Sequence, residues 1–134
     1  MAETRAPVQR PLSPHLSVYR LSLSMVMSGL HRITGLALVA GMLMLTWWLL
    51  AAAAGQNAYT TFEAFASSWI GRVILFGFSW AMLHHLLGGL RYLVWDHGYG
   101  MEPGEREWLV RANIIGSIVA TVLLWLILAM TGMR

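Results

Sequence analysis

The sequence predicts an all-α integral membrane protein with three transmembrane helices and a short cytoplasmic N-terminal segment. The chain of 134 residues is 57% hydrophobic and 11% charged, with a mean hydropathy of +0.61. It is therefore too apolar for a soluble domain of this size. Three long apolar stretches are bounded by arginine. We expect one membrane-anchor domain over residues 1–134, comprising an N-terminal segment at 1–20 and spans at about 24–54, 70–93 and 110–133.

The N-terminal segment differs from the spans. Prolines at 11 and 14 oppose a helix and favour an extended strip over residues 10–20, packed on another surface. A simple juxtamembrane linker is the alternative. The first 24 residues contain no apolar core of signal-peptide length, so we expect no cleaved export signal.

The first span has a polar face at its start. Ser28, His31 and Arg32 follow the helical spacing i, i+3, i+4 and so share one face where the helix enters the membrane surface. The charge-free run that follows, residues 33–54, extends roughly 33 Å at 1.5 Å per residue, which is enough to cross the hydrocarbon core.

The remaining chain contains two connections and two spans. Residues 55–69 form a polar connection before Arg72, and the second span has its charge-free part at 73–90. Residues 102–107 are expected to form a solvated loop, because proline, glycine and charged residues interrupt the apolar pattern. The third span, at 112–133, contains no ionisable side chain, so we expect it to pack and anchor rather than react.

The basic residues indicate the orientation. All nine are arginine, and they flank the spans, so the pI of about 10.0 is a topology signal and DNA binding by a soluble domain is excluded. Four lie in the N-terminal part, none lies in the first connection before Arg72, and Arg106 and Arg111 join Arg91 around the second connection. The positive-inside rule then places the N-terminus and second connection in the cytoplasm.

Residues 83–96 contain two histidines within a span, which by itself indicates a functional site. On a helix, His85 shares a stripe with Gly88, Gly89, Tyr92 and Asp96. The glycines remove volume where a flat macrocycle would lie, so we expect a haem with His85 as axial ligand. Alternatively, the glycines only allow a neighbouring helix to approach.

His84 lies roughly 100° around the helix from His85 and therefore has a different role. We expect it to be hydrogen-bonded within the bundle or to lie beside lipid. The chain has no cysteine, so any redox centre is held by histidine or comes from partners.

Three patches of the sequence resemble the cytochrome b subunit of the membrane anchor of succinate dehydrogenase, respiratory complex II. The first is residues 10–20, with the core Pro-Leu-Ser-Pro-His-Leu-Ser-Val-Tyr. The second is Ser-Gly-Leu-His-Arg-Ile-Thr-Gly at 28–35. The third is His-Leu-Leu-Gly-Gly-Leu-Arg at 85–91, followed by Trp95 and Asp96. The second and third are specific in combination, and the three-span plan covers nearly the whole chain.

The resemblance implies a role for each candidate residue. His85 would be an axial ligand of haem b, with the other ligand supplied by a histidine of a second membrane-anchor subunit. His31 would lie near the haem propionates, and Ser28 and Arg32 would belong to the site that reduces ubiquinone. Tyr92 departs from the family pattern, which often has histidine there.

The resemblance also implies partners and a location. Electrons from succinate would pass through a flavoprotein subunit and an iron–sulfur subunit on the cytoplasmic or matrix face. The chain would serve electron transport and the tricarboxylic acid cycle in a bacterial or mitochondrial inner membrane, as a subunit of the enzyme with no dehydrogenase active site of its own.

Physical chemistry agrees with a quinone site at the start of the first span. Charge builds up on the quinone oxygens during reduction, and the hydroxyl of Ser28 and the permanent charge of Arg32 would stabilise it. In the alternative interpretation, Arg32 binds a lipid phosphate and Ser28 makes a packing contact.

Two other functions fit the same sequence. One is the anchor of a quinol:fumarate reductase, which runs the same reaction backwards. The other is a haem-free small scaffold or proton-path subunit. A proton path requires polar residues along one face of several spans, and the third span is expected to lack them.

Overall fold

The computed structural model describes His15 and residues 18–132, which form four helices and their connections. The helices are α1 (Leu23–Ala54), α2 (Gln56–Ser67), α3 (Trp69–Asp96) and α4 (Pro103–Met130). Three of them, α1, α3 and α4, are long and apolar enough to cross a membrane, which confirms the predicted all-helical, three-span fold. Most of the predicted extended strip at 10–20 lies outside the described residues.

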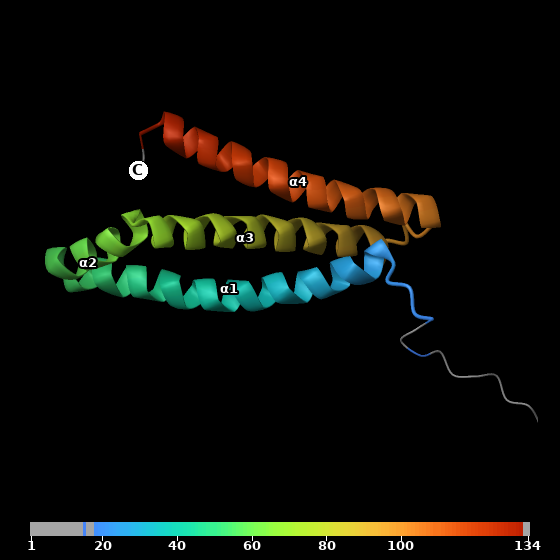
Figure 1. The fold of residues 1–134 in the computed structure, drawn as a ribbon, viewed down its shortest axis with the longest axis horizontal. Helices are drawn as coiled ribbons and strands as arrows, with labels where there is room; N and C mark the ends of the chain where they lie inside the picture. The colour runs from blue at the N-terminus through green and yellow to red at the C-terminus, as the bar shows by residue number, and fades with distance from the viewer. Residues whose placement is uncertain (1–14, 16–17, 133–134) are drawn as a thin grey trace, which may run out of the picture.

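The three spans form an up-down-up bundle in which α3 lies between α1 and α4 (Figure 1). The start of α1 lies at the same end of the bundle as the α3–α4 connection, and α2 lies at the opposite end (Figure 1). At 1.5 Å per residue, α1 with 32 residues is about 48 Å long and α3 with 28 is about 42 Å. Both exceed a hydrocarbon core of about 30 Å, so their ends extend into the interfacial regions.

The connection at 55–69 contains a helix, α2, that the sequence did not predict. Gly55 adopts φ +107°, which ends α1 and lets the chain turn sharply into α2. The aromatic rings of α2 then pack on the last turns of α1, with the Trp47 ring centroid 5.0 Å from that of Phe62 and 5.2 Å from that of Phe65. This packing stabilises a helix too short to be stable alone.

The prediction of a solvated loop at 102–107 was wrong in its secondary structure, because α4 already begins at Pro103. Proline suits the first helical position, where its missing N–H has no partner to lose. Glu105 in the first turn complements the helix dipole, and Arg111 pairs with Glu107 at 2.6 Å one turn apart. These side chains are exposed on the surface of the chain.

Candidate functional site

The interior of the bundle is more polar than its apolar sequence suggests. Only four hydrophobic side chains of the described residues are buried, whereas six polar or charged ones are. The buried polar set comprises Thr34, His84, Arg91, Asn113, Ser117 and Thr121. Burying a polar side chain inside a membrane span costs free energy unless the side chain is paired, so these residues indicate a candidate functional site.

His85 on α3 is held by the backbone and a side chain of α1. Its Nδ1 lies 3.2 Å from the carbonyl oxygen of His31 and 3.3 Å from Oγ1 of Thr34. Its ring is only half-buried, and Nε2 has no hydrogen-bond partner among the residues that the structure describes. The arrangement leaves one imidazole nitrogen of His85 available to a group from outside the chain.

The rings of His31 and His85 are stacked, with centroids 3.9 Å apart and planes 7° from parallel. The structure therefore brings together two residues that the sequence proposed for one site from different helices. The Tyr92 and His31 rings meet edge to face, with centroids 5.3 Å apart. Gly35 of α1 lies beside this stack and lets the His85 ring approach the α1 backbone closely. A Cβ at Gly35 would lie 3.1 Å from the Cε1 atom of His85.

The two neighbouring glycines of α3 have different surroundings. A Cβ at Gly88 would lie 2.5 Å from Nδ1 of His31, so the His31 ring occupies the space that this glycine leaves. Gly88 is buried, and the ring that fills its space is the one stacked on His85, so Gly88 lies beside this stack. By contrast, nothing in the described part of the chain comes within 4 Å of a Cβ at Gly89. Close helix approach thus explains Gly88, and only Gly89 leaves an open surface.

His84 points into the contact between α3 and α4, where 1% of its surface is exposed. Its Nδ1 lies 3.2 Å from Oγ of Ser117, and its carbonyl oxygen accepts a hydrogen bond of 3.2 Å from the amide of Asn113. Of the two environments predicted for His84, the hydrogen-bonded one is confirmed. Its Nε2 is buried without a partner in the described residues, so it is closed to groups outside the bundle.

The prediction that the third span lacks a polar face was wrong. Asn113, Ser117 and Thr121 recur every four residues on α4 and are all buried. Short polar side chains are easily overlooked in an apolar run, because hydropathy averages over all faces of the helix. Asn113 donates to the carbonyl of His84, and Ser117 lies against Nδ1 of His84, so these two residues join α4 to α3. The Thr121 hydroxyl donates to the carbonyl of Ser117 within α4.

Arg91 is buried to 4% exposure, although the sequence suggested only a flanking charge and a motif position. Its Nε and Nη1 have no hydrogen-bond partner in the described chain, and its Cζ atom lies 5.3 Å from the Tyr92 ring and 4.9 Å from the Trp95 ring. The aromatic faces partly offset the cost of burying the charge. Its spacing of seven from His84, through Gly88, is the sequence signal that reveals this buried stripe.

Ser28, His31 and Arg32 all lie on α1. Ser28 is one turn before His31, and Arg32 directly follows it. Ser28 is half-buried and Arg32 is exposed. Neither side chain has an ion pair or hydrogen bond within the described part of the chain. Both therefore remain available to a group bound beside the His31 end of the bundle.

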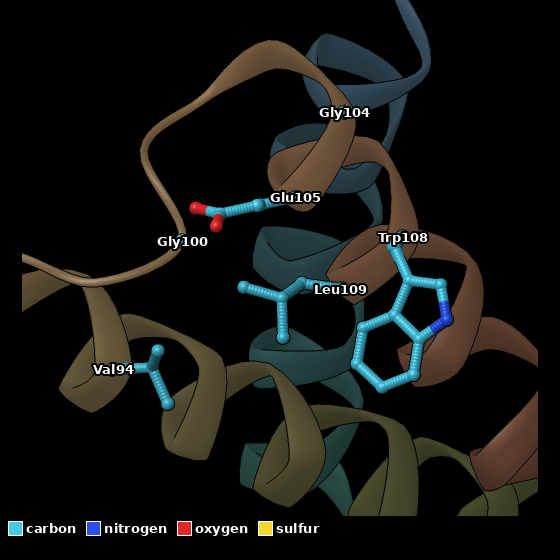
Figure 2. A pocket seen from close by; sticks show the side chains of 6 residues that line it. All are labelled: Val94, Gly100, Gly104, Glu105, Trp108 and Leu109. Carbon is cyan, nitrogen blue, oxygen red and sulfur yellow. The ribbon is translucent and has the colours of Figure 1, made fainter.

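An open cavity of about 470 Å³ lies elsewhere, at the α3–α4 connection (Figure 2). It is lined by Val94, Gly100, Gly104, Glu105, Trp108 and Leu109, none of which was a candidate residue. The described residues also contain no cluster of three or more His, Asp, Glu or Cys side chains that could hold a bare metal ion.

The fold and the site define a three-span helical membrane subunit that carries imidazole groups inside its spans. Residues 6–131 match the family described as the succinate dehydrogenase/fumarate reductase transmembrane subunit. The chain belongs to this family and is a membrane subunit of a succinate dehydrogenase complex, which implies that other complex II subunits accompany it.

Individual relatives agree with this assignment. The chain is 49% identical over 114 residues to the succinate dehydrogenase cytochrome b556 subunit of Paracoccus denitrificans, covering 85% of this chain and 88% of that protein. It is 37% identical over 127 residues to the subunit of the same name from Rickettsia felis, covering 93% and 99%. The mitochondrial cytochrome b560 subunit of Sus scrofa is 38% identical over 96 residues, covering 69% of this chain and 56% of that protein.

Proposed function

We propose that this chain binds haem b through His85 and forms part of the site at which succinate:quinone oxidoreductase reduces ubiquinone. The half-exposed imidazole of His85, with Nδ1 held by acceptors on α1 and Nε2 unpartnered in the described chain, is the observation that carries the proposal. The relatives named as cytochromes b556 support a haem of this kind.

The residues around His85 fit a flat macrocycle. Histidine ligands of metals and haem donate their second N–H to an acceptor, which fixes the ring. The His31 carbonyl and the Thr34 hydroxyl supply such acceptors, and Gly89 leaves open surface one turn along α3 from His85. When bound, the haem would supply one-electron redox chemistry, and a histidine of the second anchor subunit would complete its coordination.

The roles of the remaining residues follow from their places. The Nδ1 atom of His31 is buried against Gly88, so Nε2 is the ring nitrogen left to donate to a haem propionate. Ser28 would donate its hydroxyl hydrogen to a quinone carbonyl oxygen. Arg32 would place a permanent positive charge near the oxygen that becomes negative during reduction.

The ligand assignment is tested by the reduced-minus-oxidised visible spectrum of the purified membrane complex. We expect His85→Ala to abolish the b-type signal and His84→Ala to retain it, because the His84 ring is enclosed between α3 and α4. A signal that survives in both variants would show that the haem is held elsewhere and would overturn the assignment.

The quinone site is tested by comparing two electron acceptors in the same complex. Loss of one hydrogen bond to a charged group costs about 1.5–3 kcal/mol, so Ser28→Ala and Arg32→Leu should each slow quinone reduction about ten- to hundredfold. Succinate oxidation with a soluble dye that accepts electrons before the membrane should stay unchanged. Equal rates with quinone in wild type and both variants would refute these roles.

The direction of the reaction and the orientation in the membrane belong to the same proposal. Membranes containing the complex should oxidise succinate faster than they reduce fumarate, and the opposite ratio would identify a fumarate reductase anchor. Since the chain has no cysteine, single-cysteine variants give a clean topology test. Tyr99→Cys in the exposed α3–α4 connection should react with an impermeant thiol reagent only from the cytoplasmic side, and Asn57→Cys in α2 only from the other.

A further inference from the structure

The hydroxyl group of Thr34 lies against the candidate haem ligand, and its hydrogen bonds define what it does there. Thr34 is 1% exposed, and its Oγ1 lies 3.3 Å from Nδ1 of His85. A threonine hydroxyl carries one hydrogen, and here it is donated to the carbonyl oxygen of His31 at 3.0 Å. Toward His85, Oγ1 therefore acts as an acceptor.

This hydrogen-bond pattern determines the tautomer of His85. Both groups near Nδ1, the Thr34 hydroxyl oxygen and the His31 carbonyl oxygen, are acceptors. Nδ1 must then carry the proton and share it between the two oxygens, and Nε2 must carry the lone pair. A lone pair on Nε2 is what coordination to haem iron requires.

We propose that Thr34 is a positioning residue that holds the His85 imidazole and tunes the reduction potential of the haem. This inference rests on the proposed function, in which His85 is the axial ligand. An acceptor on Nδ1–H increases the basicity of the ligand and stabilises oxidised iron, which lowers the potential. The Thr34 oxygen adds a second acceptor to the His31 carbonyl and so strengthens this effect.

The other contacts of the His85 ring make its orientation sensitive to Thr34. One face of the ring is stacked on His31, and its Cε1 atom lies against Gly35. These contacts and the one at Nδ1 all come from five consecutive positions of α1, from His31 to Gly35, with Thr34 between them. A change in the contact at Nδ1 therefore moves the ring against fixed neighbours and alters the plane that the ligand presents to the haem.

The test is the midpoint potential of the haem in the purified complex that contains Thr34→Val. Valine replaces the acceptor oxygen with a methyl group, whose contact distance of about 3.5–4.0 Å exceeds the 3.3 Å separation seen here. The His85 ring then loses the Thr34 oxygen as an acceptor and is pushed away from the His31 carbonyl oxygen. The midpoint potential of the haem should therefore shift to a more positive value. The gmax value in the EPR spectrum of the oxidised haem should shift with it.

Two controls separate this role from packing. Thr34→Ser keeps the hydroxyl and should retain the wild-type potential and gmax. Thr46→Val removes a hydroxyl on the same helix whose one hydrogen bond among the described residues is to the carbonyl of Met42, at 2.8 Å, and should change neither value. If Thr34→Val does not assemble with haem, Thr34→Ala removes the same oxygen without adding a methyl group, and its potential and gmax should still differ from those of Thr34→Ser.

The outcomes distinguish this inference from the proposed function. If His85→Ala loses the haem signal while the Thr34 variants lacking the hydroxyl keep the wild-type potential and gmax, the role of Thr34 is overturned and the ligand assignment stands. If His85→Ala keeps the haem signal, both are overturned. A shifted potential in Thr34→Val with wild-type values in Thr34→Ser supports the proposal.

Discussion

Replacing Gly88 with alanine tests whether the stacked histidines are built on the close approach of α1 to α3. The new methyl group would lie 2.5 Å from Nδ1 and 3.0 Å from Cε1 of His31, whereas ordinary contacts begin at 3.4 Å. The His31 ring has little freedom to retreat, because it is also stacked on His85, with ring centroids 3.9 Å apart. The substitution must therefore push the two rings or separate the helices.

The expected cost is obtained by comparison with a second glycine of the same helix. A Cβ at Gly77 would meet nothing within 4 Å in the described part of the chain, so Gly77→Ala changes only helix propensity. That change favours alanine by about 1 kcal/mol at either position and cancels in the difference. What remains is the overpacking at Gly88, about 1–3 kcal/mol.

The assay is the temperature at which the purified complex loses its b-type absorbance, together with the temperature at which the chain leaves the complex. Gly88→Ala should lower both temperatures relative to wild type, and Gly77→Ala should leave them equal or higher. Equal transition temperatures for the two variants would refute the close approach of His31 to α3.

Two further substitutions test the other helix contacts by the temperature at which the chain leaves the complex. Ser117→Ala leaves Nδ1 of His84 buried without its partner and should cost about 1–3 kcal/mol of stability. Thr121→Val removes a hydroxyl whose hydrogen bond among the described residues lies within α4, and it should cost about 1 kcal/mol or less. If both variants lowered the dissociation temperature equally, the contact between His84 and Ser117 would add no stability beyond that of a hydroxyl bonded within α4. Gly71→Ala places a Cβ against main-chain atoms of α2, which cannot rotate away, so little assembled complex should form; a normal yield would contradict the tight corner between α2 and α3.

The sequence predicted the spans well and their neighbouring segments less well. Long charge-free runs identify membrane helices because length and hydropathy are local properties. The helix α2 was missed because its stability depends on aromatic packing against Trp47, and the start of α4 was missed because a polar, proline-containing first turn looks like a loop. Neither feature changes the number of spans.

For the candidate site, the sequence separated His84 from His85 correctly, because adjacent residues of a helix point in different directions. It did not show which glycine receives a ring, nor that Arg91 is buried. Both depend on the rotation of α3 relative to α1 and α4. A span that is apolar on most sides carries little amphipathic signal from which that rotation could be read.

The sequence by itself determined that this protein is a three-span membrane subunit with a histidine-rich motif near the end of its second span, because hydropathy, charge and motif spacing are written along the chain. Only the tertiary structure decided that Thr34 and the His31 carbonyl meet Nδ1 of His85, and that Ser117 meets His84. These contacts join residues far apart in sequence. They exist only once the helices have packed in one register and one rotation, which no local pattern specifies.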